Sequence, residues 1–200
     1  MALEAIDSSS SAKLPFRHIM LLYSSDEGNA VTKYVNEGLK RGYLTVYAPI
    51  NIDNNASHLS NISKITSGIV NYEDNVNRGN LLTFDTSAFY NSVLAGRVEA
   101  FEELKILLED AIEERIASEK NDGVIFVSGI AGTLGANQKF DESINAEKWW
   151  QKTHSEWLQK GLKVSMICLH PSSILNKNQF IHYKQEISSL HDITLDPISG

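Results

Sequence analysis

Short apolar runs alternate with amphipathic stretches along this chain, and this alternation constrains the fold more than any other feature. The run HIMLLY (18–23) is typical of a strand that is buried on both faces. The next segment (24–42) is expected to be a helix that ends at Gly42. Its apolar residues share one helical stripe: Val31, Tyr34, Val35 and Leu39. The change of hydrophobic period between the two segments predicts a strand followed by a helix.

The same alternation continues to the end of the sequence. Further strands are expected at 43–50, 80–84, 123–127, 163–169 and 192–195. Helices are expected at 92–119, 140–161 and 178–190, with a weaker helical stripe within 51–79. Strands that alternate with helices favour right-handed crossovers and parallel pairing. We therefore predict an α/β fold over residues 16–200, a single three-layer α/β/α domain with a mostly parallel central sheet of five to six strands. Residues 1–15 are expected to form a flexible N-terminal tail.

Composition argues against several classes of protein. The formal charge is −7, from 18 Lys and Arg against 25 Asp and Glu, so direct nucleic-acid binding is not expected. No apolar run approaches the length needed to cross a membrane, and the N-terminus lacks a secretory signal. The single cysteine, Cys168, fits a reducing compartment and is expected to be a buried, inert thiol. These features predict a cytoplasmic protein.

The first strand–helix turn lacks the motifs that bind nucleotides. A phosphate loop of the G-x-x-x-x-G-K-[ST] type or a G-x-G-x-x-G turn would be expected here. The sequence is instead YSSDEGNA, and acidic side chains at a helix N-terminus repel phosphate. ATP hydrolysis by the usual loop is therefore not expected.

Three glycines follow the fourth expected strand at intervals of three residues: Gly129, Gly132 and Gly135. Their backbone N–H groups could bind an anion. Alternatively, Gly129 and Gly132 supply positive φ angles or close packing, and this interpretation is favoured because glycine commonly serves turn geometry.

A binding pocket is expected where the strands end, because ligands of such sheets bind beyond the carboxyl ends of the strands. We place this ligand-binding site at eight residues: Ser24, Ser25, Asp85, Thr86, Ser128, Gly129, Gly132 and His170. Serine and glycine would offer hydrogen bonds and close approach, and His170 would respond to charge. Helix capping by Asp85 and a structural hydrogen bond of His170 are the alternatives.

No catalytic or metal-binding spacing is present in the sequence. The histidines and Cys168 show no H-x-x-x-H or C-x-x-C pattern, and no G-x-S-x-G elbow occurs. We therefore predict no metal, no cofactor and no catalytic residues. Trp150 and Trp157 share a helical stripe with Ala146 and Thr153, which predicts packing against the sheet.

Several segments together resemble the MEDS domain, the sensory domain named for methanogens, methylotrophs and a dichloromethane-responsive repressor. The specific part is HIMLLYSSDEG followed by NEGLKRGYLTVYA. The matching positions are His18, Tyr23, Gly38, Leu39 and Gly42. Two departures are Gly129-Ile130 in place of the family's Gly-Glu, and Leu169-His170 in place of Gln-Tyr after the cysteine.

The resemblance implies a fold related to the RecA and KaiC cores without the phosphate loop, and a role in signal transduction. The leading hypothesis is a non-catalytic sensory domain that binds a small molecule or a signalling protein, with self-association as one route for its signal. One alternative is a degenerate nucleotide-binding protein or an acid–base enzyme that uses Asp85 and His170. Another is a pure protein-interaction scaffold.

Overall fold

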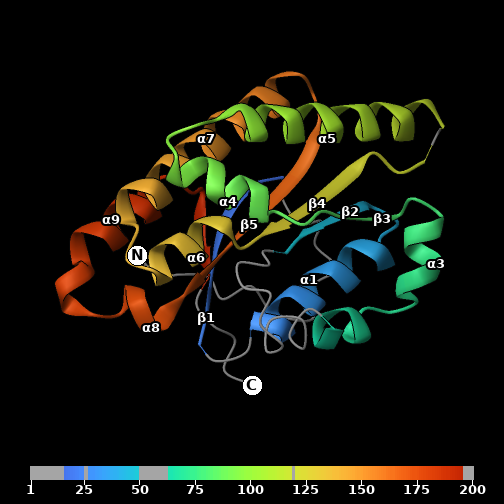
Figure 1. Ribbon diagram of the computed structural model, residues 1–200. Helices are drawn as coiled ribbons and strands as arrows, with labels where there is room; N and C mark the ends of the chain where they lie inside the picture. The colour runs from blue at the N-terminus through green and yellow to red at the C-terminus, as the bar shows by residue number, and fades with distance from the viewer. Residues whose placement is uncertain (1–15, 25–26, 50–62, 119, 196–200) are drawn as a thin grey trace, which may run out of the picture.

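The central element is a six-stranded parallel sheet with the strand order β3-β2-β4-β5-β1-β6 (Figure 1). The computed structural model describes residues 16–24, 27–49, 63–118 and 120–195. The expected tail at 1–15 lies outside these residues. The strands are β1 (His18–Tyr23), β2 (Leu44–Ala48), β3 (Leu81–Thr83), β4 (Gly123–Ser128), β5 (Lys163–Pro171) and β6 (Ile193–Leu195). The predicted α/β class, the parallel pairing and the six strands are confirmed.

Helices cover both faces of the sheet, so the predicted three layers are present (Figure 1). One face carries α1 (Glu27–Lys40), a helix at 63–68 and α3 (Tyr72–Asn77). The other face carries α4 (Ser87–Leu94), α5 (Glu99–Ala117), α6 (Ile130–Ala136), α7 (Phe140–Gln159), α8 (Ser172–Leu175) and α9 (Ile181–Ser189), with a 3-10 turn, η1 (Asn178–Phe180), before α9.

The alternation of side chains along each strand explains the two cores. Ile19, Leu21, Ile167 and Leu169 are buried under α1. Residues of opposite parity, such as Met20 and Met166, are buried under the α4–α9 face. Both faces are therefore apolar, as the continuous apolar runs require.

The expected single helix at 92–119 is wrong, because the chain makes two helices there. α4 ends at Leu94, and Gly96 adopts a φ of +67°, in the left-handed region that glycine tolerates best. α5 then begins at Glu99. Gly96 therefore separates two helices rather than lying within one long helix.

Three other expectations need correction. The glycine-rich segment after β4 is the helix α6 rather than a loop. Asp141, whose residue type is favoured at an N-cap and which is expected to cap the helix at 140–161, lies instead in the first turn of α7, and Lys139 holds the N-cap position. Strand β5 extends to Pro171, so His170 is a strand residue rather than a loop residue.

Candidate functional site

Asp85 and Thr86, two residues of the expected pocket, take part in local hydrogen bonds. Asp85 accepts hydrogen bonds from the backbone N–H (2.9 Å) and the hydroxyl (2.5 Å) of Ser87, at the start of α4. Thr86 is buried, and its hydroxyl donates to the carbonyl of Pro49 at 2.8 Å. Ser24 is exposed just after β1, and Ser25 lies outside the described residues.

The glycine-rich segment packs a helix against a strand. A Cβ added at Gly132 would lie only 1.9 Å from the carbonyl oxygen of Leu169, so the backbones of α6 and β5 approach closely. Gly129 has a φ of −109° and Gly132 also has no positive φ, so a left-handed conformation is not the reason for either glycine. Ser128 is buried, and its Oγ accepts the N–H of Ile130 at 3.4 Å.

His170 lies apart from the exposed residues of that set. Its side chain is buried, and its Nε2–H donates to Glu147 Oε1 at 3.0 Å. Asp85 is exposed and accepts the N–H of Ser87 one residue after the N-cap Thr86, and no hydrogen bond or ion pair joins Asp85 to His170 within the described part of the chain. The geometry thus provides no acid–base pair from these two residues.

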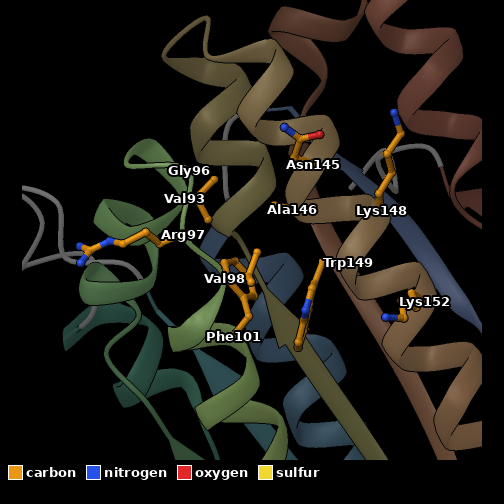
Figure 2. Close-up of a pocket in the computed structure, with 10 residues that line it drawn as sticks. All are labelled: Val93, Gly96, Arg97, Val98, Phe101, Asn145, Ala146, Lys148, Trp149 and Lys152. Carbon is orange, nitrogen blue, oxygen red and sulfur yellow. The ribbon is translucent and has the colours of Figure 1, made fainter.

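A surface hollow lies between the α4–α5 connection and α7 (Figure 2). Its volume is about 410 Å³, which is within the range of small-molecule sites. Ten residues line it: Val93, Gly96, Arg97, Val98, Phe101, Asn145, Ala146, Lys148, Trp149 and Lys152. We call this hollow the α5–α7 groove.

Two aromatic residues, Phe101 and Trp149, line the α5–α7 groove. Phe101 and Trp149 have ring centroids 4.9 Å apart, and the Trp149 indole N–H donates to Glu102 Oε1 at 2.9 Å. This hydrogen bond and the ring contact hold the Trp149 side chain in place. The groove is therefore partly preformed.

The charge at the rim of the α5–α7 groove is positive, although the whole chain is acidic. Three lining residues are cationic and none is acidic. Figure 2 shows the amino end of Lys152 turned toward Trp149, whereas Arg97 and Lys148 extend outward. Lys148 is paired with Glu186 at 3.0 Å, and Lys152 lies 3.8 Å from Glu156. Lys152 is thus the most loosely paired cation that faces the groove.

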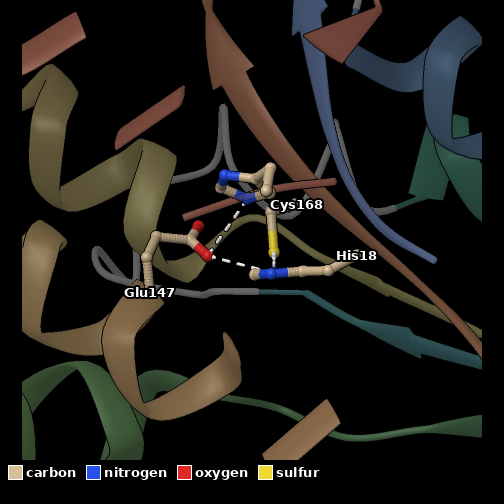
Figure 3. Close-up of side chains that lie close together, drawn as sticks. His18, Glu147 and Cys168 are labelled. Carbon is tan, nitrogen blue, oxygen red and sulfur yellow. Dashed lines mark hydrogen bonds and ion pairs between the residues drawn. The ribbon is translucent and has the colours of Figure 1, made fainter. Parts of the chain in front are cut away.

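Five ionisable side chains meet inside the protein, on the α7 side of the sheet, and we call them the buried polar cluster. Its members are His18 from β1, Glu147 from α7, Cys168 and His170 from β5, and His191 just before β6. Figure 3 labels three of them, His18, Glu147 and Cys168. His18, Cys168 and His170 share one face because their strands pair in parallel with Met20 opposite Cys168. Glu147 faces them from the buried stripe of α7.

Opposing effects act on the charges of the cluster. Burial by itself raises the pKa of Glu147, but the charge of His191 and the hydrogen bond from His170 outweigh it and hold this pKa well below its usual range. Burial lowers the pKa of His191, but the neighbouring Glu147 carboxylate overcomes this and raises it. Burial, reinforced by Glu147, raises the pKa of Cys168 far above its usual range, so an isolated thiol there is protonated.

Sequence reasoning missed Glu147 and His191 as members of a site. One signal was available for Glu147, because it falls between Ser143 and Trp150 on the stripe that α7 buries. A carboxylate is almost never fully buried without a partner. His191 carries no comparable signal, since its position depends on how α9 leads into β6.

Comparisons with known proteins do not assign a family. No protein-family model matches the chain, and no curated protein matches its sequence. Among solved structures, the chain is similar to the flagellar accessory protein FlaH from Methanocaldococcus jannaschii. The identity is 14%, the match covers 90% of this chain and 72% of FlaH, and the TM-score is 0.42. In the described residues, no helix combines the length and the apolar character that a membrane crossing requires.

Proposed function

We propose that this chain is a non-catalytic binding domain that takes a small organic anion in the α5–α7 groove. The observation that carries the proposal is the combination of an apolar, aromatic wall with a rim of three cations and no acid. Small-molecule sites are typically apolar hollows with a few placed polar groups. A ligand that fits has a flat or branched apolar body and one carboxylate.

The chemistry of the wall decides the orientation of this ligand. The apolar body lies against Phe101 and Trp149, where it leaves water, and the carboxylate faces the amino group of Lys152. The charge-assisted hydrogen bond from Lys152 distinguishes a carboxylate from a neutral amide of the same shape.

A sensory role follows from where the ligand would sit. The groove joins separate elements, because Val93 lies in α4, Gly96 to Val98 lie in the α4–α5 connection, and Trp149 belongs to α7. A ligand that touches both sides favours the arrangement in which they are close together, and this shifts the population of conformations. The MEDS-like sequence pattern and the cytoplasmic location expected from the sequence are consistent with such a sensor.

The test is a thermal-shift screen with a matched set of charge variants. The panel contains aromatic and branched aliphatic carboxylates, their neutral amides, ADP and ATP with Mg²⁺. A carboxylate at about 100 times its Kd stabilises the protein by about 2.7 kcal/mol, which raises the Tm measurably. Lys152→Gln should weaken this response, whereas Lys40→Gln, which removes one charge from α1 on the other face, should leave it unchanged.

Three results would count against the proposal. The first is a panel without any stabilising carboxylate. The second is an equal response to the acids and their amides, because Lys152 would then play no part. A response to ATP with Mg²⁺ that Lys152→Gln leaves intact would instead support the nucleotide-binding alternative at another place.

The scaffold alternative keeps one specific observation in its favour. On α5, Ile106 and Leu107 are 57% and 53% exposed, and the acidic residues Glu103 and Asp110 lie about one helical turn away on either side. Such neighbouring exposed apolar side chains favour a protein contact. Under this alternative the mass from light scattering rises with concentration, and Leu107→Lys abolishes that rise. A mass that stays monomeric for the unsubstituted chain at every concentration argues against self-association through this face.

A further inference from the structure

We propose that the buried polar cluster is a binding site for a divalent transition-metal ion of the zinc type, held by His18, Glu147, Cys168 and His191. One candidate ligand atom from each residue lies within 4.8 Å of the others, and all four side chains are buried. The four residues come from β1, α7, β5 and the turn just before β6, so the site exists only in the folded protein.

The distances approach those of a tetrahedral site. Zinc bonds of 2.0–2.3 Å place neighbouring ligand atoms roughly 3.3–3.6 Å apart. His18 Nε2 lies 3.3 Å from Cys168 Sγ and 3.3 Å from Glu147 Oε2. His191 Nε2 lies 3.2 Å from the same carboxylate oxygen. Two of these separations therefore fall within the range and the third, at 3.2 Å, is slightly shorter, while the whole set of ligand atoms lies within 4.8 Å.

The hydrogen bonds of both histidines leave the correct nitrogen available. His18 Nδ1–H donates to the carbonyl of Leu190 at 2.9 Å, and His191 Nδ1–H donates to the carbonyl of Ile187 at 2.9 Å. Each Nε2 therefore faces the centre of the cluster. A hydrogen bond from the second ring nitrogen to a backbone carbonyl is the usual support of a metal-bound histidine.

Two atoms at the centre lack hydrogen-bond partners. Glu147 Oε2 and His191 Nε2 are fully buried and make no hydrogen bond, although they lie at ion-pair distance, 3.2 Å apart, and Oε2 also lies 3.3 Å from His18 Nε2. Glu147 Oε1, by contrast, is held by His170 Nε2–H at 3.0 Å, which fixes the carboxylate. A buried polar atom without a partner is costly, and a cation among the four ligand atoms would satisfy both of these atoms at once.

The charge and the chemistry of the four groups suit such an ion. Two imidazole nitrogens, one carboxylate oxygen and one thiolate match the ligands that zinc accepts. When the ion binds, the Cys168 thiol proton and the Nε2 proton of a charged His191 are both released to solvent, and the metal–sulfur and metal–nitrogen bonds form in their place. A divalent ion with one thiolate and one carboxylate is electrically neutral, so the filled site leaves no net charge in the core. All four positions around the ion are taken by protein, which is typical of a structural rather than a catalytic site.

The experiment uses Co²⁺ in place of zinc, because the absorption spectrum of bound Co²⁺ depends on the type and geometry of its ligands. The chain is produced with added Co²⁺, and a second sample is refolded with Co²⁺; metal per chain is then measured by mass spectrometry. Cys168 is the only cysteine, so a thiolate-to-cobalt charge-transfer band in the near ultraviolet can arise only from this residue within the chain. We expect one ion per chain, this band, and the intense visible bands of tetrahedral cobalt.

Substitutions identify the remaining ligands. Cys168→Ser should abolish the charge-transfer band. His191→Gln should weaken the affinity for Co²⁺ by at least about 100-fold, because loss of a direct ligand costs more than loss of a residue that only supports a ligand, which costs up to about 100-fold. His170→Gln should keep the band but weaken the affinity by roughly 10- to 100-fold, because His170 positions Glu147 without touching the ion. His182→Gln is the control, since His182 is exposed on α9.

Two results would overturn the site. One is the absence of bound Co²⁺ from both preparations of the unsubstituted chain, in which case the cluster is only a buried ion pair between His191 and Glu147. The other is bound Co²⁺ without the thiolate band, which would place the ion elsewhere. Both results come from the unsubstituted chain, so they remain informative if a variant fails to fold.

Discussion

Replacing Gly132 with alanine tests whether the glycines after β4 serve packing. The added Cβ would lie 1.9 Å from the oxygen of Leu169, 2.9 Å from its carbonyl carbon and 3.1 Å from the Cα of His170. All three atoms belong to the backbone of the buried strand β5. To restore an ordinary contact, α6 must move away from the strand by about 1.5 Å.

The expected cost follows from two opposing effects. Overpacking a core typically costs 1–3 kcal/mol, and the upper end applies because the strand backbone cannot rotate out of the way. Alanine is better than glycine inside a helix by about 1 kcal/mol, which offsets part of the loss. Gly132→Ala should therefore lower the free energy of unfolding by about 2 kcal/mol, which corresponds to roughly 4–8 °C in Tm for a chain of this size.

The assay is urea unfolding followed by circular dichroism, with Gly135→Ala as the matched variant. Both substitutions gain the same helix propensity, but a Cβ at Gly135 meets mainly the hydroxyl end of Tyr183, at 2.2 Å. The loss there should be smaller, about 1 kcal/mol, and the added substitution Tyr183→Phe should reduce it further because the clashing oxygen is removed. If Gly132→Ala is as stable as the unsubstituted chain, close packing does not explain this glycine.

Two further predictions concern buried polar side chains. Arg115 is buried, and its guanidinium donates to the carbonyls of Gly42 and Asn121, which joins the end of α5 to the sheet. Arg115→Met should therefore lower the free energy of unfolding, measured by urea titration, by about 2–3 kcal/mol. A variant as stable as the unsubstituted chain would contradict this. Burial raises the pKa of Tyr183 to about 12 despite the hydrogen bond with Ser143, so above pH 10 the unfolded chain loses this proton first. The free energy of unfolding should then fall by about 1.4 kcal/mol per pH unit until the pKa of the folded state is reached. When this free energy is measured at pH about 9 and at pH about 11, the decrease between the two should be smaller for Tyr183→Phe than for the unsubstituted chain. Equal falls in both proteins would exclude Tyr183 as the cause.

The helices show where periodicity is a sufficient guide and where it is not. In α7, the predicted stripe of Ala146, Trp150, Thr153 and Trp157 is buried as expected, because a surface helix has only one apolar face. In the segment 92–119, the apolar spacing does not reveal that Gly96 has a positive φ and separates α4 from α5. Periodicity detects a buried face, but it does not detect a single residue that changes the direction of the backbone.

The candidate sites were predictable only in part. The spacing of Cys168 and His170 by two residues indicates that both point to the same face of a strand. The α5–α7 groove has no local signature, because its wall joins residues of the α4–α5 connection to residues of α7. Metal motifs are recognised by short spacings, whereas His18 and His191 are separated by almost the whole chain.

The sequence by itself determined the class of this protein, because strand and helix periods are local properties that follow from the alternation of apolar residues. It also determined that no phosphate loop follows β1, since that motif lies within one short segment. The tertiary structure alone decided that Glu147 meets His18, Cys168 and His191. Such a meeting depends on strand order, register and the position of α7 over the sheet, and these arise from packing between segments that are distant in the chain.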